Sequence, residues 1–124
     1  MVGDRNLNRA TAQIERAQAD KRLRPSIAGF FDEATNTVSY VVHDPKTGEA
    51  AIIDSVLDFD AASGRTSNGS ADRMIEYVTS NNLKVTWLIE THAHADHISA
   101  APYLQERLGG KLAIGCDIIR VQEV

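Results

Sequence analysis

Cysteine, aromatic residues and long apolar runs are scarce in this sequence. Its 124 residues, the length of one ordinary domain, include a single cysteine, Cys116, so no disulfide can form within the chain. A reducing, cytoplasmic location is therefore expected. No apolar run approaches the roughly 18–20 residues that cross a bilayer, and the opening residues lack the apolar stretch of a secretory signal. We therefore expect no membrane partner.

Charged residues are common and unevenly distributed. The chain is 43% hydrophobic and 24% charged, which is typical of soluble globular proteins and excludes collagen-like and disordered classes. Residues 1–24 carry six basic and three acidic side chains, although the whole chain has a net charge of −4. The body is therefore acidic, which argues against a nucleic-acid partner. We expect residues 1–24 to form a basic leader, helical or disordered and exposed to solvent, with a docking arm as the alternative.

The first part of the body has the pattern of a β-hairpin. Residues 37–42 are β-branched and aromatic, as strands prefer. A turn containing Pro45 and Gly48 follows, and residues 50–53 form a second strand. Residues 58–70 are rich in Gly, Ser and Asn, which predicts a loop.

Helical and strand patterns alternate after this loop. The expected elements are a helix from about 70 to 80 capped by Ser70 or Asp72, a strand over 85–89 buried on both faces, a helix over about 98–108, a strand over 111–114 and a helix over 116–124. Pro102 is compatible with the second helix only in its first turn, and Gly109 is typical of the residue at which a helix ends. The alternation predicts an α/β domain over residues 25–124. The last helix has neither a cap nor a polar tail, so we expect the chain to end inside its fold.

The informative stretch is residues 91–97, which read Thr-His-Ala-His-Ala-Asp-His. Three of the four histidines lie here, directly after the predicted buried strand. Imidazole and carboxylate are good ligands for zinc, iron and manganese. In extended backbone His92 and His94 project to the same side and can meet one ion, while Asp96 and His97 could hold a second ion or orient the ligands of the first. The alternative is a loop that only caps the next helix, with Asp96 as the N-cap.

This motif resembles the HxHxDH motif of the metallo-β-lactamase superfamily. The similarity covers about residues 25–124, and the flanking stretches 37–40, 52–60 and 90–98 look most like bacterial persulfide dioxygenases and β-lactamase hydrolase-like proteins. The resemblance implies the N-terminal αβ half of an αββα sandwich. It assigns His92, His94, Asp96 and His97 to metal binding, a catalytic role to Asp96, and to Asp54 the support of the metal loop through hydrogen bonds; a solvated carboxylate is the alternative for Asp54.

The remaining candidates do not complete such a site. The superfamily adds another histidine and a bridging aspartate well after the motif, but no histidine follows His97 here. His43 is expected at the turn end of the hairpin, out of reach, as a surface residue. Asp117 is better explained as a helix N-cap, and Cys116 as a buried residue at a helix start rather than a reactive thiol.

Three functions follow from the resemblance. The first is persulfide dioxygenase-like oxidation of glutathione persulfide to sulfite, with one Fe(II) ion and a small thiol-derived substrate. The second is a hydrolase of thioesters or lactones, similar to glyoxalase II, with one or two Zn(II) ions. The third, of another class, is a catalytically incomplete fragment or assembly module, completed by a missing C-terminal half or by a homo-oligomer. Whether this chain is itself an enzyme therefore stays open at this point.

Overall fold

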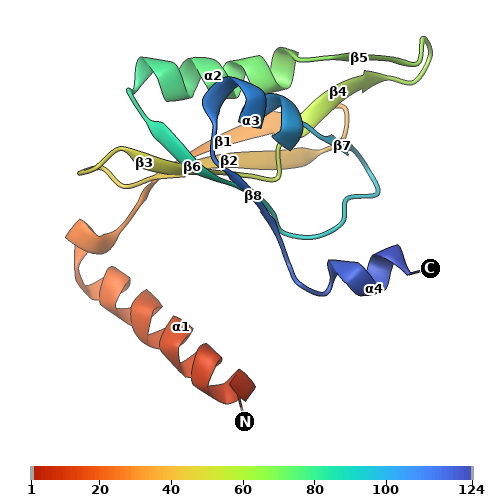
Figure 1. Ribbon diagram of the computed structural model, residues 1–124. Helices are drawn as coiled ribbons and strands as arrows, with labels where there is room; N and C mark the ends of the chain where they lie inside the picture. Colours follow the sequence, from red (N-terminus) through yellow and green to blue (C-terminus); the bar gives the residue numbers. More distant parts are fainter. Residues whose placement is uncertain (1, 124) are drawn as a thin grey trace.

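Two sheets and four α-helices make up residues 2–123, the part that this computed structural model describes (Figure 1). The strands are β1 (Ser26–Asp32), β2 (Thr37–His43), β3 (Glu49–Ile53), β4 (Val56–Asp60), β5 (Arg65–Ser67), β6 (Lys84–Glu90), β7 (Ile98–Ser99) and β8 (Lys111–Ile114). The helices are α1 (Val2–Ala19), α2 (Gly69–Ser80), α3 (Ala101–Leu108) and α4 (Ile118–Gln122), and a 3-10 turn, η1 (Lys21–Leu23), follows α1. Over these residues no helix is both long and apolar enough to cross a membrane.

The larger sheet has the strand order β1-β2-β3-β6-β8. The predicted hairpin is confirmed, because β2 and β3 pair antiparallel with Tyr40 opposite Ile53 and His43 opposite Ala50. β1 was not predicted, yet it pairs with the whole of β2. The other two pairs, β3 with β6 and β6 with β8, are parallel, so the carboxyl ends of β3 and β6 lie side by side.

Helices α2 and α3 cover one face of this sheet (Figure 1). The core between them includes Met74 of α2, Leu104 of α3 and Leu88 of β6, all nearly inaccessible to solvent. The expectation that residues 85–89 are buried on both faces is wrong. Val85 and Leu88 face the helices, but Trp87 is 44% exposed, because in residues 2–123 nothing covers the other face.

That second face of the sheet is apolar across several strands. Neighbouring strands place Gly29 beside Tyr40, Tyr40 beside Ile53 and Phe31 beside Val38, and paired residues point to the same side of a sheet. The large apolar side chains exposed on this face, called the bare face below, are Ile27, Phe31, Val38, Tyr40 and Trp87. In proteins with two sheets packed face to face, apolar faces of this kind form the core between the sheets.

The stretch 58–70, predicted as a loop, includes the end of β4, all of β5 and the start of α2. β4 pairs antiparallel with β5 and with β7, forming the second sheet, and the Gly/Ser-rich residues supply the turn between β4 and β5. The predicted caps of α2 are also wrong: the helix begins at Gly69, and Asn68 is the N-cap. The Asp58 carboxylate accepts hydrogen bonds from the Ser70 backbone N–H at 2.7 Å and from its hydroxyl, so a neighbouring strand satisfies this helix end.

Helix α3 begins three residues later than predicted, because residues 98–99 are held in β7 by Val56 and Leu57. Pro102 lies in its first turn, as expected, and Gly109 ends it with a φ of +74°. Gly110 follows with a φ of +95°, and a Cβ there would lie 3.3 Å from the Val85 side chain. This turn therefore requires glycine where α3 returns the chain to β8.

The two terminal helices lie outside the core. Figure 1 shows α1 extending away from the sheets, and its side chains from Gly3 to Arg16 are exposed. α4 has no buried residue among those described. Cys116 lies in the turn before α4 and is exposed, so the expectation of a buried cysteine is wrong. Asp117 takes the N-cap position of α4 but makes no side-chain capping hydrogen bond.

Candidate metal centre

The predicted site lies where the adjacent parallel strands β3 and β6 end. β3 ends at Ile53 and is followed by Asp54, while β6 leads directly into the loop 91–97. The Asp54 backbone N–H donates to the Ile89 carbonyl at 2.9 Å, which fixes the two strand ends against each other. Ligand sites in open α/β sheets form at such carboxyl ends.

Asp54 holds the start of the loop. Its carboxylate accepts two hydrogen bonds from Thr91, one from the backbone N–H at 2.8 Å and one from the hydroxyl at 2.6 Å. Its φ of +54° is in the left-handed region, and its carbonyl accepts a hydrogen bond from the buried Ser39 hydroxyl at 2.6 Å. A non-glycine residue kept in this strained conformation is typical of functional sites.

The environment of Asp54 favours the charged carboxylate. Partial burial raises the pKa of Asp54, but the hydrogen bonds from Thr91 and the contact with His94 lower it by more, so the net pKa lies below the ordinary value. Asp54 is thus ionised at neutral pH and faces the histidine loop, as expected of a residue that supports a metal centre.

His94 is the central histidine of the loop. Its side chain is only 8% exposed, and its Nε2 lies 2.8 Å from Asp54 Oδ1 and 3.1 Å from Glu90 Oε2. The Asp54 and Glu90 carboxylates thus both lie beside Nε2 of this ring. Asp96 lies beside the other ring nitrogen, with 3.9 Å between His94 Nδ1 and Asp96 Oδ1.

Asp96 and His97 lie on that side of His94. The His94 and His97 rings are 4.2 Å apart between centroids, and Asp96 Oδ1 is 3.3 Å from His97 Nδ1. The Thr37 hydroxyl donates to Asp96 Oδ2 at 3.1 Å and lies 3.4 Å from His97 Nδ1. The pKa of Asp96 is lowered by its own backbone N–H, with further contributions from Thr37 and His97.

These residues fit a metal ion. His94, Asp96 and His97 each offer a ligand atom within 4.8 Å of the others, and so do Asp54, His92 and His94. His97 Nε2 is buried with no hydrogen-bond partner, and an unpartnered buried imidazole nitrogen is costly unless a ligand or ion satisfies it. The alternative that Asp96 caps the following helix does not fit, because α3 begins at Ala101 with Ala100 as its N-cap.

His92 is brought to the same place but lies nearer solvent. Its ring centroid is 4.2 Å from that of His94, and its side chain borders a shallow hollow shared with Cys116. A second hollow, beside Asp96 and His97, is lined by all five residues of β4, of which three are apolar and two are aspartates. Both hollows adjoin the histidine loop, so the loop is open to small molecules.

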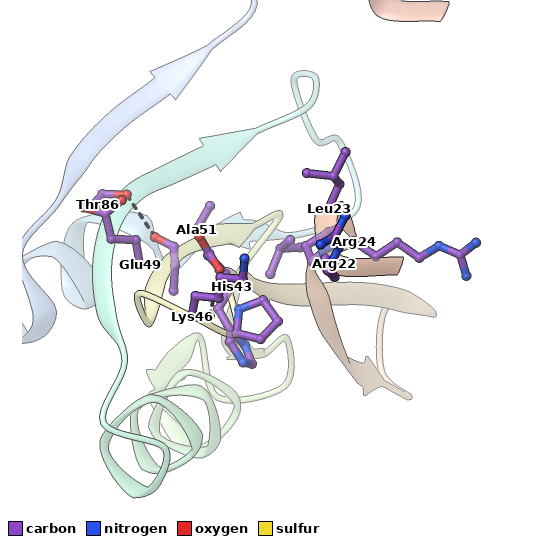
Figure 2. A pocket seen from close by; sticks show the side chains of 13 residues that line it. Arg22, Leu23, Arg24, His43, Lys46, Glu49, Ala51 and Thr86 are labelled. Atoms are coloured by element: carbon purple, nitrogen blue, oxygen red, sulfur yellow. Dashed lines mark hydrogen bonds between the residues drawn. The ribbon is translucent and has the colours of Figure 1, made fainter. Parts of the chain in front are cut away.

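His43 lies in a different part of the molecule, as predicted. It borders a hollow between η1 and the β2–β3 turn, together with Arg22 and Lys46 (Figure 2). Its Nδ1 is buried without a hydrogen-bond partner, so the expectation of a plain surface turn residue is wrong.

Three residues of the site had no role in the sequence-based prediction: Thr37, Glu90 and Thr91. Thr37 could have been found, since the hairpin register places the start of β2 beside the end of β3. Thr91 and Glu90 flank the motif, but no spacing rule distinguishes them from ordinary strand residues. The contacts of Thr91 with Asp54 depend on the parallel pairing of β3 with β6, which the sequence pattern does not specify. Glu90 instead contacts His94, four residues further along the chain, and Ser99 of β7.

Comparison with known proteins assigns the class. The profile of the metallo-beta-lactamase superfamily matches residues 32–115, so the chain belongs to this superfamily. A probable metallo-hydrolase of Burkholderia pseudomallei is 56% identical over 99 residues, which are 80% of this chain and 34% of that protein. A beta-lactamase hydrolase-like protein of Agrobacterium fabrum is 48% identical over 93% of this chain and 26% of its own length.

Persulfide dioxygenases are also among the relatives. The mitochondrial persulfide dioxygenase ETHE1 of Bos taurus is 30% identical over 65% of this chain and 28% of its own length. The crystal structure of ETHE1 from Myxococcus xanthus matches with a TM-score of 0.58 and 31% identity, covering 70% of this chain and 34% of that one. The chain thus spans only about a quarter to a third of the length of these relatives.

Proposed function

We propose that this chain supplies the histidine loop of a mononuclear iron centre in a persulfide dioxygenase-like enzyme. The observation that carries the proposal is that His94, Asp96 and His97 each offer a candidate ligand atom within 4.8 Å of the others. The Nε2 atom of His94 lies beside the Asp54 and Glu90 carboxylates, which hold the ring in place. The similarity to proteins named persulfide dioxygenase or ETHE1 supports the reaction. His92, His94, Asp96 and His97 are the proposed ligands or their immediate neighbours, with Asp54 in support.

In this proposal the chain's own residues hold and orient the centre. Asp54 fixes Thr91 and His94, and Thr37 fixes Asp96 and His97 from β2. A ferrous ion bound there would supply the redox chemistry by which dioxygen oxidises a persulfide sulfur to sulfite. The hollow beside Asp96, with its apolar β4 wall, is the proposed position of a small thiol-derived substrate such as glutathione persulfide. We propose a cytoplasmic location on the grounds of the single cysteine.

The second candidate is a zinc hydrolase of thioesters or lactones. It is favoured by the 56% identity to a protein named as a probable metallo-hydrolase and by the two overlapping groups of candidate ligands, which suit two ions as well as one. Imidazole and carboxylate accept zinc and iron alike, so the loop by itself does not choose between them.

The third candidate is an assembly module that needs another polypeptide segment to complete its site. It is favoured by the bare face of the sheet, where Ile27 is 63% and Phe31 51% exposed. Apolar patches of this kind are typical of interfaces. A second copy of the chain or a further half of the sandwich would fill that face.

Elemental analysis of the purified 124-residue chain is the test, followed by oxygen uptake with glutathione persulfide after anaerobic loading with Fe(II). Iron near one per chain with persulfide-dependent oxygen uptake supports the dioxygenase. Zinc with thioesterase activity and no oxygen uptake supports the hydrolase, and negligible metal supports the assembly module. His94→Ala should lose the metal, whereas His43→Ala, a histidine at the other end of the sheet, should retain it.

A further inference from the structure

Helix α1 carries a narrow apolar stripe along one side. Gly3, Leu7, Ala10, Ile14 and Ala17 recur at alternating intervals of four and three residues, which places them on the same side of an α-helix. These five residues are called the α1 stripe below. Its two large side chains are mostly uncovered, with Leu7 66% and Ile14 57% exposed. A helix gains most of its stability by packing an apolar side, so the α1 stripe favours a partner surface.

The bare face has the size and shape to be that surface. The 18 residues of α1 make a helix about 27 Å long and about 10 Å across. Because strands lie about 4.8 Å apart, a helix placed over β3 also contacts Tyr40 on β2 and Trp87 on β6. At that place β3 offers the small Ala51, between Val42 and Trp87. The hollow beside η1 adjoins the bare face at Val42 and Ala51 (Figure 2), so a helix fits there between larger side chains.

The α1 helix is held away from the bare face of its own chain. The Arg24 guanidinium donates hydrogen bonds to the Ala17 carbonyl at 2.9 Å and to the Gln18 carbonyl at 2.6 Å. The ion pair of Asp20 with Arg22, at 2.8 Å, braces the turn between them. Figure 1 shows α1 projecting from the sheets on the side away from α2 and α3. The α1 stripe is therefore presented to a neighbouring molecule.

Charge favours a second copy of this chain as that neighbour. Residues 1–24 carry six basic and three acidic side chains, whereas residues 25–124 carry seven basic and fourteen acidic ones. The leader of one copy and the body of another attract each other, while two leaders repel. Exposed carboxylates also stand at both ends of the strands that form the bare face, with Glu33 after β1 and Asp44 after β2.

We propose that two copies of the chain associate by exchanging helices, so that the α1 stripe of each copy lies on the bare face of the other, over β3. The exchange is symmetric and closed, because each copy uses both of its apolar surfaces and leaves neither for a third copy. Only two large side chains enter from each helix, so the interface is small and the dimer dissociates on dilution. The inference rests on the assembly-module candidate, names the occupant of the bare face, and needs no metal ion.

Trp87 supplies the probe. It is the only tryptophan of the chain and lies on the bare face, 44% exposed, so its fluorescence reports whether that face is covered. The test measures Trp87 emission and molar mass, by sedimentation, as the 124-residue chain is concentrated through the micromolar range. The mass should rise from 13.5 kDa to twice that value, and the emission should move to shorter wavelength in step. EDTA excludes metal ions, so failure of the proposed metal centre does not affect the result.

Matched variants of α1 assign the contact. Leu7→Gln with Ile14→Gln removes the large side chains of the α1 stripe but keeps good helix formers, and it should stay monomeric with unshifted emission. Asn8→Gln with Ala19→Gln, at exposed positions on the other side of α1, should dimerise as the wild type does. Thermal melts check that both variants keep the folded body, to whose core α1 does not belong.

Four results overturn the proposal. The first is a monomer at every concentration, whether or not its own α1 covers Trp87. The second is a dimer in which Trp87 stays exposed, as pairing of two α1 helices would give. The third is dimerisation of the stripe variant like that of the wild type, as direct packing of two bare faces would give. The fourth is a mass that rises beyond two chains, since a closed exchange ends at the dimer.

Discussion

Thr91 donates two hydrogen bonds to the Asp54 carboxylate, from its backbone N–H at 2.8 Å and from its hydroxyl at 2.6 Å. The pair joins the residue after β3 to the residue after β6, and thereby connects the strand ends to the first residue of the histidine loop. The same carboxylate contacts His94. The loop is therefore anchored at its start and near its middle by one side chain.

Thr91→Val should destabilise the chain by about 1 kcal/mol, since it removes the hydroxyl hydrogen bond and retains the shape of the side chain. Thr66→Val is the matched control, because Thr66 is exposed on β5. Urea unfolding followed by circular dichroism measures both changes. Equal stability of the two variants would contradict the anchoring role of the Thr91 hydroxyl.

Asp54→Asn should alter the pH dependence of stability. The folded-state pKa of Asp54 lies below its ordinary value of 3.8, so its contribution is complete above pH 3.8 and is lost as the pH falls through the folded-state pKa. The Tm difference between wild type and Asp54→Asn should therefore be largest above pH 3.8 and shrink in more acidic solution. Thermal melts across this range, with Asp117→Asn as an exposed control, measure it; a difference that grows on acidification has the wrong sign.

Leu104→Ala should be among the most destabilising single changes in the chain. Leu104 is 0% exposed in the core between α3 and the sheet, and truncation of a buried leucine costs about 2–5 kcal/mol. Leu7→Ala, on the exposed surface of α1, should change stability by less than about 0.5 kcal/mol. Denaturant titrations of both variants decide whether α3 packs as described.

Gly110→Ala should destabilise the turn between α3 and β8. Its φ of +95° disfavours any residue with a Cβ, and that Cβ would lie 3.3 Å from both the side chain and the carbonyl oxygen of Val85. The expected cost is about 1–2 kcal/mol. Gly115→Ala is the control, since a Cβ there meets no atom within 4 Å; thermal melts that place both variants at the same Tm would refute the requirement.

The local patterns predicted those elements whose burial follows one period. The hairpin, α2, β6 and the Pro102 start of α3 were readable because alternation, helical spacing and proline geometry act over a few residues. β4, β5 and β7 were not, because they are only five, three and two residues long and become strands by pairing with one another. Trp87 shows a second limit of prediction from local sequence. An apolar run indicates a strand, but it does not indicate whether one or both faces of the strand are covered.

The candidate site divides in the same way. The spacing predicts His92, His94, Asp96 and His97 as candidate metal ligands, and the resemblance predicts a supporting role for Asp54. The contact of Thr37 with Asp96 and that of Ser99 with Glu90 depend on which segments lie side by side in the folded chain. The expectation of a buried Cys116 is wrong because its turn lies outside the core. Contacts between distant segments carry no local signature, so only the folded chain reveals them.

The bare face has a practical consequence for handling the protein. A dye such as ANS becomes fluorescent on exposed apolar surface and is commonly used to recognise molten globules. Here Ile27, Phe31, Val38, Tyr40 and Trp87 present such surface in the native fold, so the dye should respond to fully folded chain. Near-UV circular dichroism and the cooperativity of the melt, rather than dye fluorescence, are therefore the appropriate criteria of a folded preparation.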